Sequence, residues 1–343
     1  MKQTIHILAC ASLLALAACS DDETAGFEVL RSELYFSAAA GKGYVLVSDA
    51  GCTATVSEAW CRTEHKGDSI LVYTDNNTSI ENRTAMLTLS SPSGVQRLPV
   101  TQSGAYFRIE SAGVEDGTTI HTGDARRVFD LKLTSTFDYT VDVSAPWLTA
   151  EQNGAGLMLL AEENATGRPR RAVVSIANPT MDKKLTIEVM QYELTDLEGT
   201  WTAEYETRAT AAGSPVETVS ETVELSITGN RIRLDGFSDG QGGTFALLAE
   251  ARAEGRFAFV TGTDLGQHTV GNRQFSLSLY GPSDSFGMMI TSGLVQQSEL
   301  SITDAGDLEC SFTTDTPQLS GFSILADGRI MRYIRCLKLS RTY

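Results

Sequence analysis

Basic residues are scarce in this chain of 343 residues: Lys and Arg number 27 against 43 Asp and Glu, which gives a formal net charge of -16. A protein that binds nucleic acid has to neutralise phosphates with clustered Lys and Arg. The one dense basic cluster, residues 168–171, is interrupted by Pro169 and is expected to be a surface loop. The composition therefore argues against nucleic acid as a partner.

Long apolar runs, histidine and closely spaced cysteine pairs are also lacking. The apolar run Ile5–Leu16 is too short to cross a hydrocarbon core of about 30 Å as a helix. His65, His121 and His268 have no second ligand at zinc spacing, and no Cys-x-x-Cys pair occurs. We expect no bound metal and no cofactor.

Catalytic signatures are missing as well. The chain has no Gly-x-Ser-x-Gly elbow, no phosphate-binding loop followed by Lys-Ser/Thr and no His-Glu-x-x-His. A glycosidase needs two carboxylates about 5 to 9.5 Å apart, and nothing singles out a pair among so many acids. The stretch Asp235–Gly243 lacks the ligand spacing of a calcium loop, so we expect a flexible loop there. We predict a protein that is not an enzyme; an unrecognised hydrolase is the alternative.

Apolar residues do concentrate at the N-terminus. Met1 and Lys2 precede the apolar run, and Leu16-Ala17-Ala18-Cys19 ends it. Residues 1–18 resemble a bacterial lipoprotein signal peptide. The resemblance implies that Cys19 is acylated and that the chain is cut just before it. Two or three acyl chains make such an attachment effectively permanent.

Residues 19–26 then form an acidic tether. The run Ser20-Asp21-Asp22-Glu23 is similar to the surface-export signal of lipoproteins from the Bacteroidota; a solvated tether without a signal is the alternative. The resemblance implies a protein of the outer membrane, anchored to the membrane by its N-terminal lipid and exposed on the cell surface.

Four cysteines lie beyond the N-terminal segment, which contains Cys10 and Cys19: Cys52, Cys61, Cys310 and Cys336. An even number in an oxidising compartment permits disulfides. Three pairings are possible, and proximity in the sequence favours Cys52 with Cys61 and Cys310 with Cys336. Such bonds contribute about 2.5 to 3.5 kcal/mol each.

An internal repeat covers residues 27–193. Ser57-Glu58-Ala59-Trp60 is echoed 87 residues later by Ser144-Ala145-Pro146-Trp147. At the same offset Arg83 matches Arg170, and each copy ends on Val-x-Gln, at Gln102 and at Gln191. The chain therefore uses one unit twice, over residues 27–104 and 105–193.

Apolar residues alternate with polar ones inside each unit, as in residues 85–89 and 172–176. Short strands separated by turns predict an immunoglobulin-like β-sandwich in each unit. The pattern of Trp, then Asn and Arg before a strand, then Val-x-Gln resembles the BACON domain of Bacteroidota surface proteins. That resemblance implies a glycan-utilisation system in which the domain is a carbohydrate-binding module or a spacer.

Trp60 and Trp147 invite comparison with sugar-stacking platforms. Tryptophan beside a strand end in a small sandwich usually fills the core, so we expect both in the core. We likewise expect Arg83 and Arg170 to bind loop carbonyls rather than a ligand.

The repeat does not return after Gln191, and residues 194–343 form a third domain. Alternating strands on both sides of Gly229-Asn230 predict a hairpin in an antiparallel meander, which can close into a barrel. A weak alanine-rich run at 245–253 is the one helical candidate. Gly199-Thr200-Trp201 is similar to the opening motif of lipocalins, which implies that Trp201 plugs the closed end of a barrel.

Aromatic residues of this domain either line a ligand cavity or fill the core, and we expect core: Phe237, Phe245, Phe257, Phe259, Phe286, Phe312 and Tyr333. The sequence thus predicts an all-β protein with two tandem immunoglobulin-like sandwiches and a lipocalin-like antiparallel β-barrel. As its function we expect non-catalytic binding of a glycan or small molecule in a polysaccharide-utilisation system. The alternative is a spacer or adaptor that binds an outer-membrane protein partner.

Overall fold

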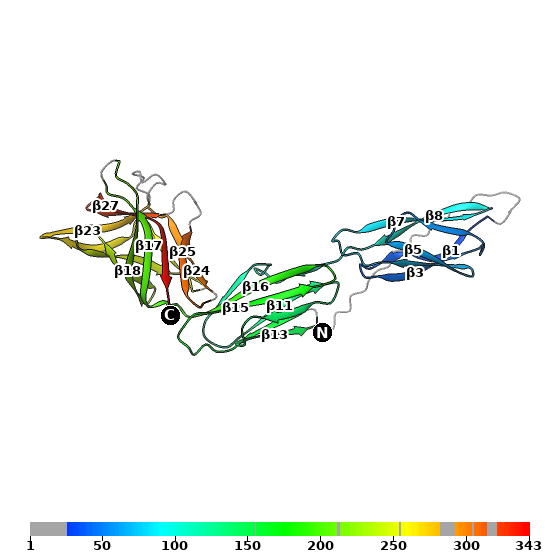
Figure 1. The fold of residues 1–343 in the computed structure, drawn as a ribbon, viewed down its shortest axis with the longest axis horizontal. Coiled ribbons are helices and arrows are strands. Elements are labelled where there is room, and N and C mark those ends of the chain that lie inside the picture. Colours follow the sequence, from blue (N-terminus) through cyan, green and yellow to red (C-terminus); the bar gives the residue numbers. More distant parts are fainter. Residues whose placement is uncertain are drawn as a thin grey trace, which may run out of the picture. The chain divides into compact units, whose positions relative to one another are not determined.

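The computed structural model describes residues 26–154, 156–210, 213–253, 255–281, 292–303, 305–313 and 321–343. They form two compact units, of which the first ends at Ala105 and the second runs from Tyr106 to Tyr343. Across these ranges the only helix is a short 3-10 helix, η1 (Leu194–Leu197), and the other elements are strands (Figure 1). The all-β prediction is confirmed. No helix in these ranges is long and apolar enough to span a membrane.

The first unit is a sandwich of two four-stranded sheets. Its strands are β1 (Val29–Glu33), β2 (Tyr35–Phe36), β3 (Gly41–Val47), β4 (Thr53–Val56), β5 (Cys61–Lys66), β6 (Ser69–Thr74), β7 (Arg83–Ser91) and β8 (Gly94–Gln102). One sheet has the order β1-β3-β6-β5 and the other β2-β8-β7-β4, with β2 parallel to β8. This is the strand order of the immunoglobulin fold. Val45, Ile70 and Leu87 are fully buried between the sheets because every second residue of each strand points inward.

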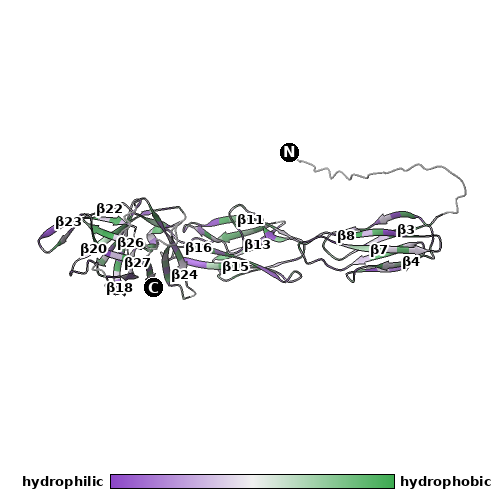
Figure 2. Cartoon of the chain, turned by 90° about the horizontal axis from the view of Figure 1, so that it is seen from above, coloured by the Kyte–Doolittle hydropathy of each residue, from purple (hydrophilic) through white to green (hydrophobic). Residues whose placement is uncertain are grey.

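The second unit begins with a sandwich of the same topology. Its strands are β9 (Phe107–Ile109), β10 (Thr119–Thr122), β11 (Arg127–Ser135), β12 (Thr140–Val143), β13 (Leu148–Asn153), β14 (Gly156–Ala161), β15 (Arg170–Asn178) and β16 (Lys183–Gln191). The sheets have the orders β13-β14-β11-β9 and β10-β16-β15-β12, again with a parallel first strand, β10 beside β16. Figure 2 shows the hydrophobic and hydrophilic residues alternating along such strands.

Eight further strands close into an antiparallel barrel. In ring order they are β17 (Gly199–Thr207), β18 (Glu217–Thr228), β19 (Arg231–Ser238), β20 (Thr244–Ala251), β21 (Phe257–Val260), β24 (Val295–Ile302), β25 (Leu308–Thr313) and β27 (Arg329–Arg341). Pairing of β17 with β27 closes the ring. The predicted hairpin is β18–β19, and its Gly229 has a positive φ of 59°. The alanine-rich run at 245–253 is not helical, because most of it belongs to β20.

A smaller sheet branches from the barrel, and the sequence did not predict it. It consists of β22 (Asp264–Val270), β23 (Arg273–Tyr280) and β26 (Gly321–Ala326), which pairs with the first part of β27. The last part of β27 pairs with β25 instead. Cys336, with a φ of 51°, lies between the two parts, where the pairing with β17 is irregular.

Side chains fill the barrel interior. Trp201 is 2% exposed, and its Nε1 donates a hydrogen bond of 2.8 Å to the Leu197 carbonyl of η1. The predicted core aromatics within the described ranges are buried or packed against the same cluster: Phe237, Phe245, Phe257, Phe259, Phe312 and Tyr333. Phe286 lies outside those ranges. Phe322 of β26 packs on Phe259 with ring centroids 4.9 Å apart, so the branching sheet shares this core.

Candidate ligand-binding site

The repeated Trp, Arg and Gln come together in each sandwich. In the first, Nε of Arg83 donates to Oε1 of Gln102 at 2.9 Å, and its Nη2 donates to the Asp75 carbonyl at 2.8 Å. The guanidinium lies 4.3 Å from the Trp60 ring centroid. Gln102 is fully buried, and its Nε2 donates to three main-chain carbonyls, including that of Ala38 at 3.1 Å.

The second sandwich repeats this arrangement, which we call the Trp-Arg-Gln clasp. Arg170 donates to Gln191 at 2.9 Å and to the Glu162 carbonyl at 2.6 Å, and it lies 4.4 Å from the Trp147 ring centroid. Desolvation lowers the pKa of the Arg170 guanidinium from its ordinary value. Both arginines therefore bind loop carbonyls, and the two tryptophans are half-buried with a guanidinium over the ring. These residues hold the sandwiches together and do not form an open ligand platform.

The four cysteines do not form the favoured pairs. Cys52, Cys61 and Cys310 are buried free thiols. Cys52 precedes Thr53, which pairs with Ser90 near the end of β7, whereas Cys61 lies near Arg83 at its beginning. The seven residue steps of β7 from Arg83 to Ser90 span about 23 Å at ~3.3 Å per residue. A disulfide requires Cα atoms within about 7 Å, so Cys52 and Cys61 lie too far apart to form one.

Cys310 and Cys336, the other favoured pair, lie in different environments. Cys310 belongs to the barrel core, whereas Cys336 is exposed on β27. Burial raises the pKa of the Cys310 thiol, as it does for Cys52 and Cys61. Thiols with raised pKa values react slowly as nucleophiles.

The stretch Asp235–Gly243 is mainly the end of β19 and a tight turn. Asp239 is 3% exposed: its Oδ1 accepts from the amides of Gln241 and Gly243, and its Oδ2 lies 3.0 Å from Nε2 of His268 on β22. Hydrogen bonds from these partners lower the pKa of Asp239 against the opposing effect of burial. The pair ties the branching sheet to the barrel. In the part of the chain that the structure describes, no group of three or more His, Cys, Asp or Glu is placed to hold a metal.

A polar network lies inside the barrel near the same turn. The Tyr205 hydroxyl donates to Oε2 of Glu221 at 2.8 Å and accepts from Nη2 of Arg332 at 3.2 Å. Burial, above all, raises the pKa of Tyr205 to about 12. The tyrosine therefore stays neutral at physiological pH.

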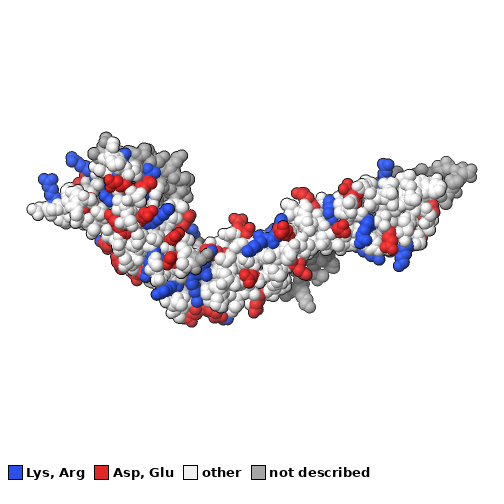
Figure 3. Space-filling model, viewed as in Figure 1, with Lys and Arg blue, Asp and Glu red and all other residues white. Residues whose placement is uncertain are grey.

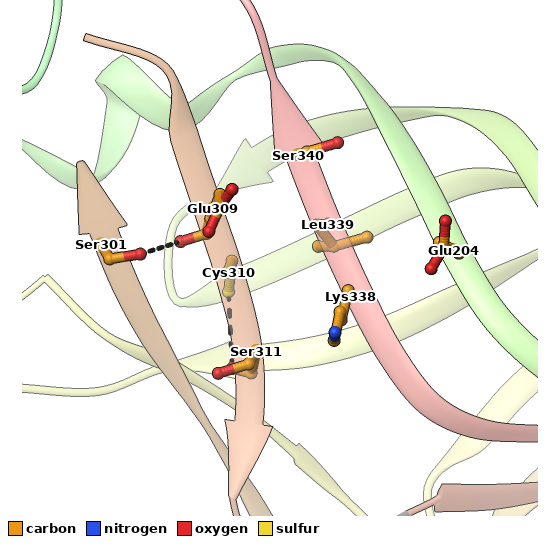
Figure 4. Close-up of a pocket in the computed structure, with 8 residues that line it drawn as sticks. All are labelled: Glu204, Ser301, Glu309, Cys310, Ser311, Lys338, Leu339 and Ser340. Carbon is orange, nitrogen blue, oxygen red and sulfur yellow. Dashed lines mark hydrogen bonds between the residues drawn. The ribbon is translucent and has the colours of Figure 1, made fainter. Parts of the chain in front are cut away.

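The outer wall of the barrel carries a groove of about 300 Å³ (Figure 4). It crosses β24, β25, β27 and β17, and its polar lining is exposed: Glu204, Ser301, Glu309, Ser311, Lys338 and Ser340. Main-chain atoms around the buried Cys310 and Leu339 complete it. We call this site the outer groove.

Strand register builds the outer groove from two rows. Glu309 pairs with Ser301 on one side and with Ser340 on the other. Lys338 pairs with Ser311 and with Glu204 in the same way. Because neighbouring strands lie about 4.8 Å apart, each row of three residues spans about 10 Å.

The chemistry of the outer groove suits a ligand rich in hydroxyl groups. Serine hydroxyls donate and accept, carboxylates accept, and the Lys338 ammonium donates. The short serines leave the hollow between the longer charged side chains. Sequence reasoning missed all six polar lining residues, because each is simply the outward residue of an alternating strand. Only the register between strands distant in the sequence brings them together.

The N-terminal assignments, namely the signal peptide, acylated Cys19 and the acidic residues up to Glu23, lie outside the described residues.

Comparison with known proteins gives no family. No protein-family model and no curated protein sequence matches the chain. Among solved structures, a family 5 xyloglucanase from Bacteroides ovatus in complex with a heptasaccharide is similar at 23% identity and a TM-score of 0.22, over 23% of this chain and 19% of that one. An I-band fragment of titin is similar at 9% identity and a TM-score of 0.27, over 88% of this chain and 95% of that one.

An endo-fucoidan hydrolase of glycoside hydrolase family 107 is similar at 13% identity and a TM-score of 0.25, over 48% of this chain and 34% of that one. This chain thus spans about a fifth of the xyloglucanase (19%) and a third of the fucoidan hydrolase (34%). None of the three likenesses assigns an activity to it.

Proposed function

We propose that this protein is a non-catalytic, lipid-anchored protein of the outer-membrane surface that binds a glycan in the outer groove of its barrel. The observation that carries the proposal is the groove itself, with serine hydroxyls and charged groups in two rows across four strands. The barrel interior is packed with side chains, which favours binding on the outer wall. Ser301 donates to the main-chain oxygen of Glu309 at 3.5 Å and not to a general base, in keeping with a binding role.

The two sandwiches fit this proposal as spacers. Their Trp-Arg-Gln clasps are engaged in internal contacts, and their motif resembles the BACON domain of Bacteroidota glycan-utilisation proteins. A lipid on Cys19 would attach the chain to the membrane at the first spacer. The barrel would then be the part that meets the ligand.

Removal of the acylated thiol tests the anchor. Cys19→Ala is expected to leave the precursor unlipidated, because acyl transfer requires that thiol. Cys10→Ala is the matched control, since Cys10 lies within the apolar run and should not affect acylation. Metabolic labelling with a radioactive fatty acid and detergent phase partitioning measure both variants. Equal labelling of the Cys19→Ala variant and the unaltered chain would contradict the anchor.

Removal of two charges tests the outer groove. In the soluble mature chain carrying Cys19→Ala, the double substitution Glu309→Ala with Lys338→Ala leaves the net charge unchanged. A charge-assisted hydrogen bond is worth about 1.5–3 kcal/mol, so we expect at least about tenfold weaker binding of a recognised polysaccharide. Affinity electrophoresis and calorimetry against a panel of soluble polysaccharides provide the measurement.

The control is another charge-neutral pair. Arg233→Ala with Asp235→Ala removes an exposed ion pair of β19, outside the groove, and should leave binding unchanged. If no polysaccharide of the panel binds, glycan binding is wrong. A protein partner recovered in stoichiometric amount from native membranes would then favour the adaptor role, in which the clasped sandwiches are a stalk.

A further inference from the structure

A second hollow of the second unit lies where β16 leads into the barrel. It has a volume of about 350 Å³, and its lining includes His121, Arg127, Phe129, Tyr192, Glu193 and Arg252. A neighbouring hollow of about 370 Å³ shares His121 with it and includes Arg256 and Glu299. We call the two hollows together the junction cleft. The hollow of about 370 Å³ also shares Ser301 and Ser311 with the outer groove, so the cleft and the groove adjoin.

Positive charge is concentrated in the junction cleft. Three guanidinium groups line it, from Arg127, Arg252 and Arg256, in a chain whose net charge is -16. Two carboxylates, Glu193 and Glu299, also belong to the lining, and Arg252 forms an exposed ion pair with Glu250 at 3.1 Å, so the arginines outnumber the acids of the lining by one. Figure 3 shows Lys and Arg side chains interspersed with Asp and Glu side chains on the surface.

A buried tyrosine supports the segment that carries two of these arginines. Tyr192 is 3% exposed, and its ring meets the His121 imidazole edge-on at 6.0 Å between centroids. The Tyr192 hydroxyl donates to the Gly255 carbonyl at 3.4 Å. A Cβ at residue 255 would lie 2.7 Å from the Tyr192 ring, so glycine lets the turn bearing Arg252 and Arg256 pack directly on the tyrosine. Arg252 and Arg256 are thereby held beside Tyr192.

We infer that the junction cleft recognises the carboxylate groups of an acidic saccharide, so that the glycan bound by this protein contains uronic acid. Guanidinium groups bind carboxylates through paired, charge-assisted hydrogen bonds. The half-buried Phe129 of the lining offers apolar surface to a sugar ring, and each hollow lies within the ~300–1,000 Å³ range of ligand sites. The inference rests on the proposed function and names its ligand class. In it, Arg127 and Arg252 select for the acid, while the outer groove binds neighbouring hydroxyl groups.

Oligogalacturonate and an uncharged galactose oligomer of equal length distinguish this inference from neutral glycan binding. The soluble mature chain should bind the acidic oligomer at least tenfold more tightly, with an affinity that falls as NaCl screens the charges. Arg127→Gln with Arg252→Gln should weaken acidic binding at least tenfold. Arg273→Gln with Arg329→Gln removes the same charge from exposed hairpin residues outside the cleft and should leave it unchanged.

The outcomes separate the two proposals. The two oligomers could bind equally, with no effect of Arg127→Gln with Arg252→Gln but a loss of binding with Glu309→Ala and Lys338→Ala. That result would contradict the acidic ligand and support the outer groove. If both arginine double variants lose the same amount of acidic binding, the effect is one of net charge. That result would contradict carboxylate recognition in the junction cleft. If neither oligomer nor any polysaccharide of the panel binds, both proposals are wrong.

Discussion

Trp201→Ala is expected to lower the free energy of unfolding of the second unit by about 3–5 kcal/mol, the cost of removing a large aromatic side chain from a packed core. Trp201 is 2% exposed and lies at the end of the barrel that η1 covers. The ring packs in a core that includes strands from the whole barrel, so little of the cavity can be filled by local movement. Urea unfolding combined with hydrogen exchange, read separately over β1–β8 and β17–β27, measures the effect.

Trp201→Phe separates volume from hydrogen bonding. It keeps most of the apolar side chain but removes the donor to the Leu197 carbonyl, so a smaller loss of about 1–2 kcal/mol is expected. The first unit does not contain this residue and should exchange as before in both variants. A loss below about 1 kcal/mol for Trp201→Ala would contradict the assignment of Trp201 as a core residue that closes the barrel end.

Local patterns predicted the local parts of the fold well. Alternation in residues 85–89 and 172–176 marks β7 and β15, because a strand buried on one face must alternate. The Gly229-Asn230 hairpin is equally local. The offset between Trp60 and Trp147 predicted two sandwiches of one type, and both have immunoglobulin strand order.

Pairing between strands that are distant in the sequence could not be predicted from local patterns. Closure of the barrel depends on Ala203 pairing with Leu339, and no local pattern encodes that register. In the branching sheet, β23 alternates like the barrel strands, so its sequence did not distinguish it from a strand of the barrel wall. Closeness in sequence also gave a wrong disulfide pairing for Cys52 and Cys61, because β4 runs along the sandwich between these two residues.

The outer groove and the junction cleft share this limitation. Ser301, Ser311 and Ser340 are ordinary outward residues in their own strands, and His121 is 131 residues from Arg252 in the sequence. A ligand site on a sheet surface is a property of register. The clasp residues were visible because the chain repeats them, and repetition marks a structural requirement as readily as a functional one.

Gln191→Ala is expected to destabilise the second sandwich by about 2–4 kcal/mol, since it leaves several buried polar groups without partners. Gln191 is fully buried; its Nε2 donates to the carbonyls of Gly123, Asp124 and Glu162 at 3.0–3.2 Å, and its Oε1 accepts from Arg170. Without it, the Arg170 guanidinium loses its side-chain acceptor and keeps only the Glu162 carbonyl. Thermal unfolding and hydrogen exchange over β9–β16 measure the loss.

The repeat supplies a matched control in the same chain. Gln102→Ala removes the equivalent contacts from the first sandwich, and its effect should be of similar size but confined to β1–β8. Gln191→Glu keeps an acceptor for Arg170 but replaces the amide donor with a carboxylate facing three carbonyls, so it should destabilise as well. Recovery of full stability in Gln191→Glu would mean that the bond to Arg170 alone matters. That result would contradict the hypothesis that the buried amide of the clasp joins three segments of each sandwich.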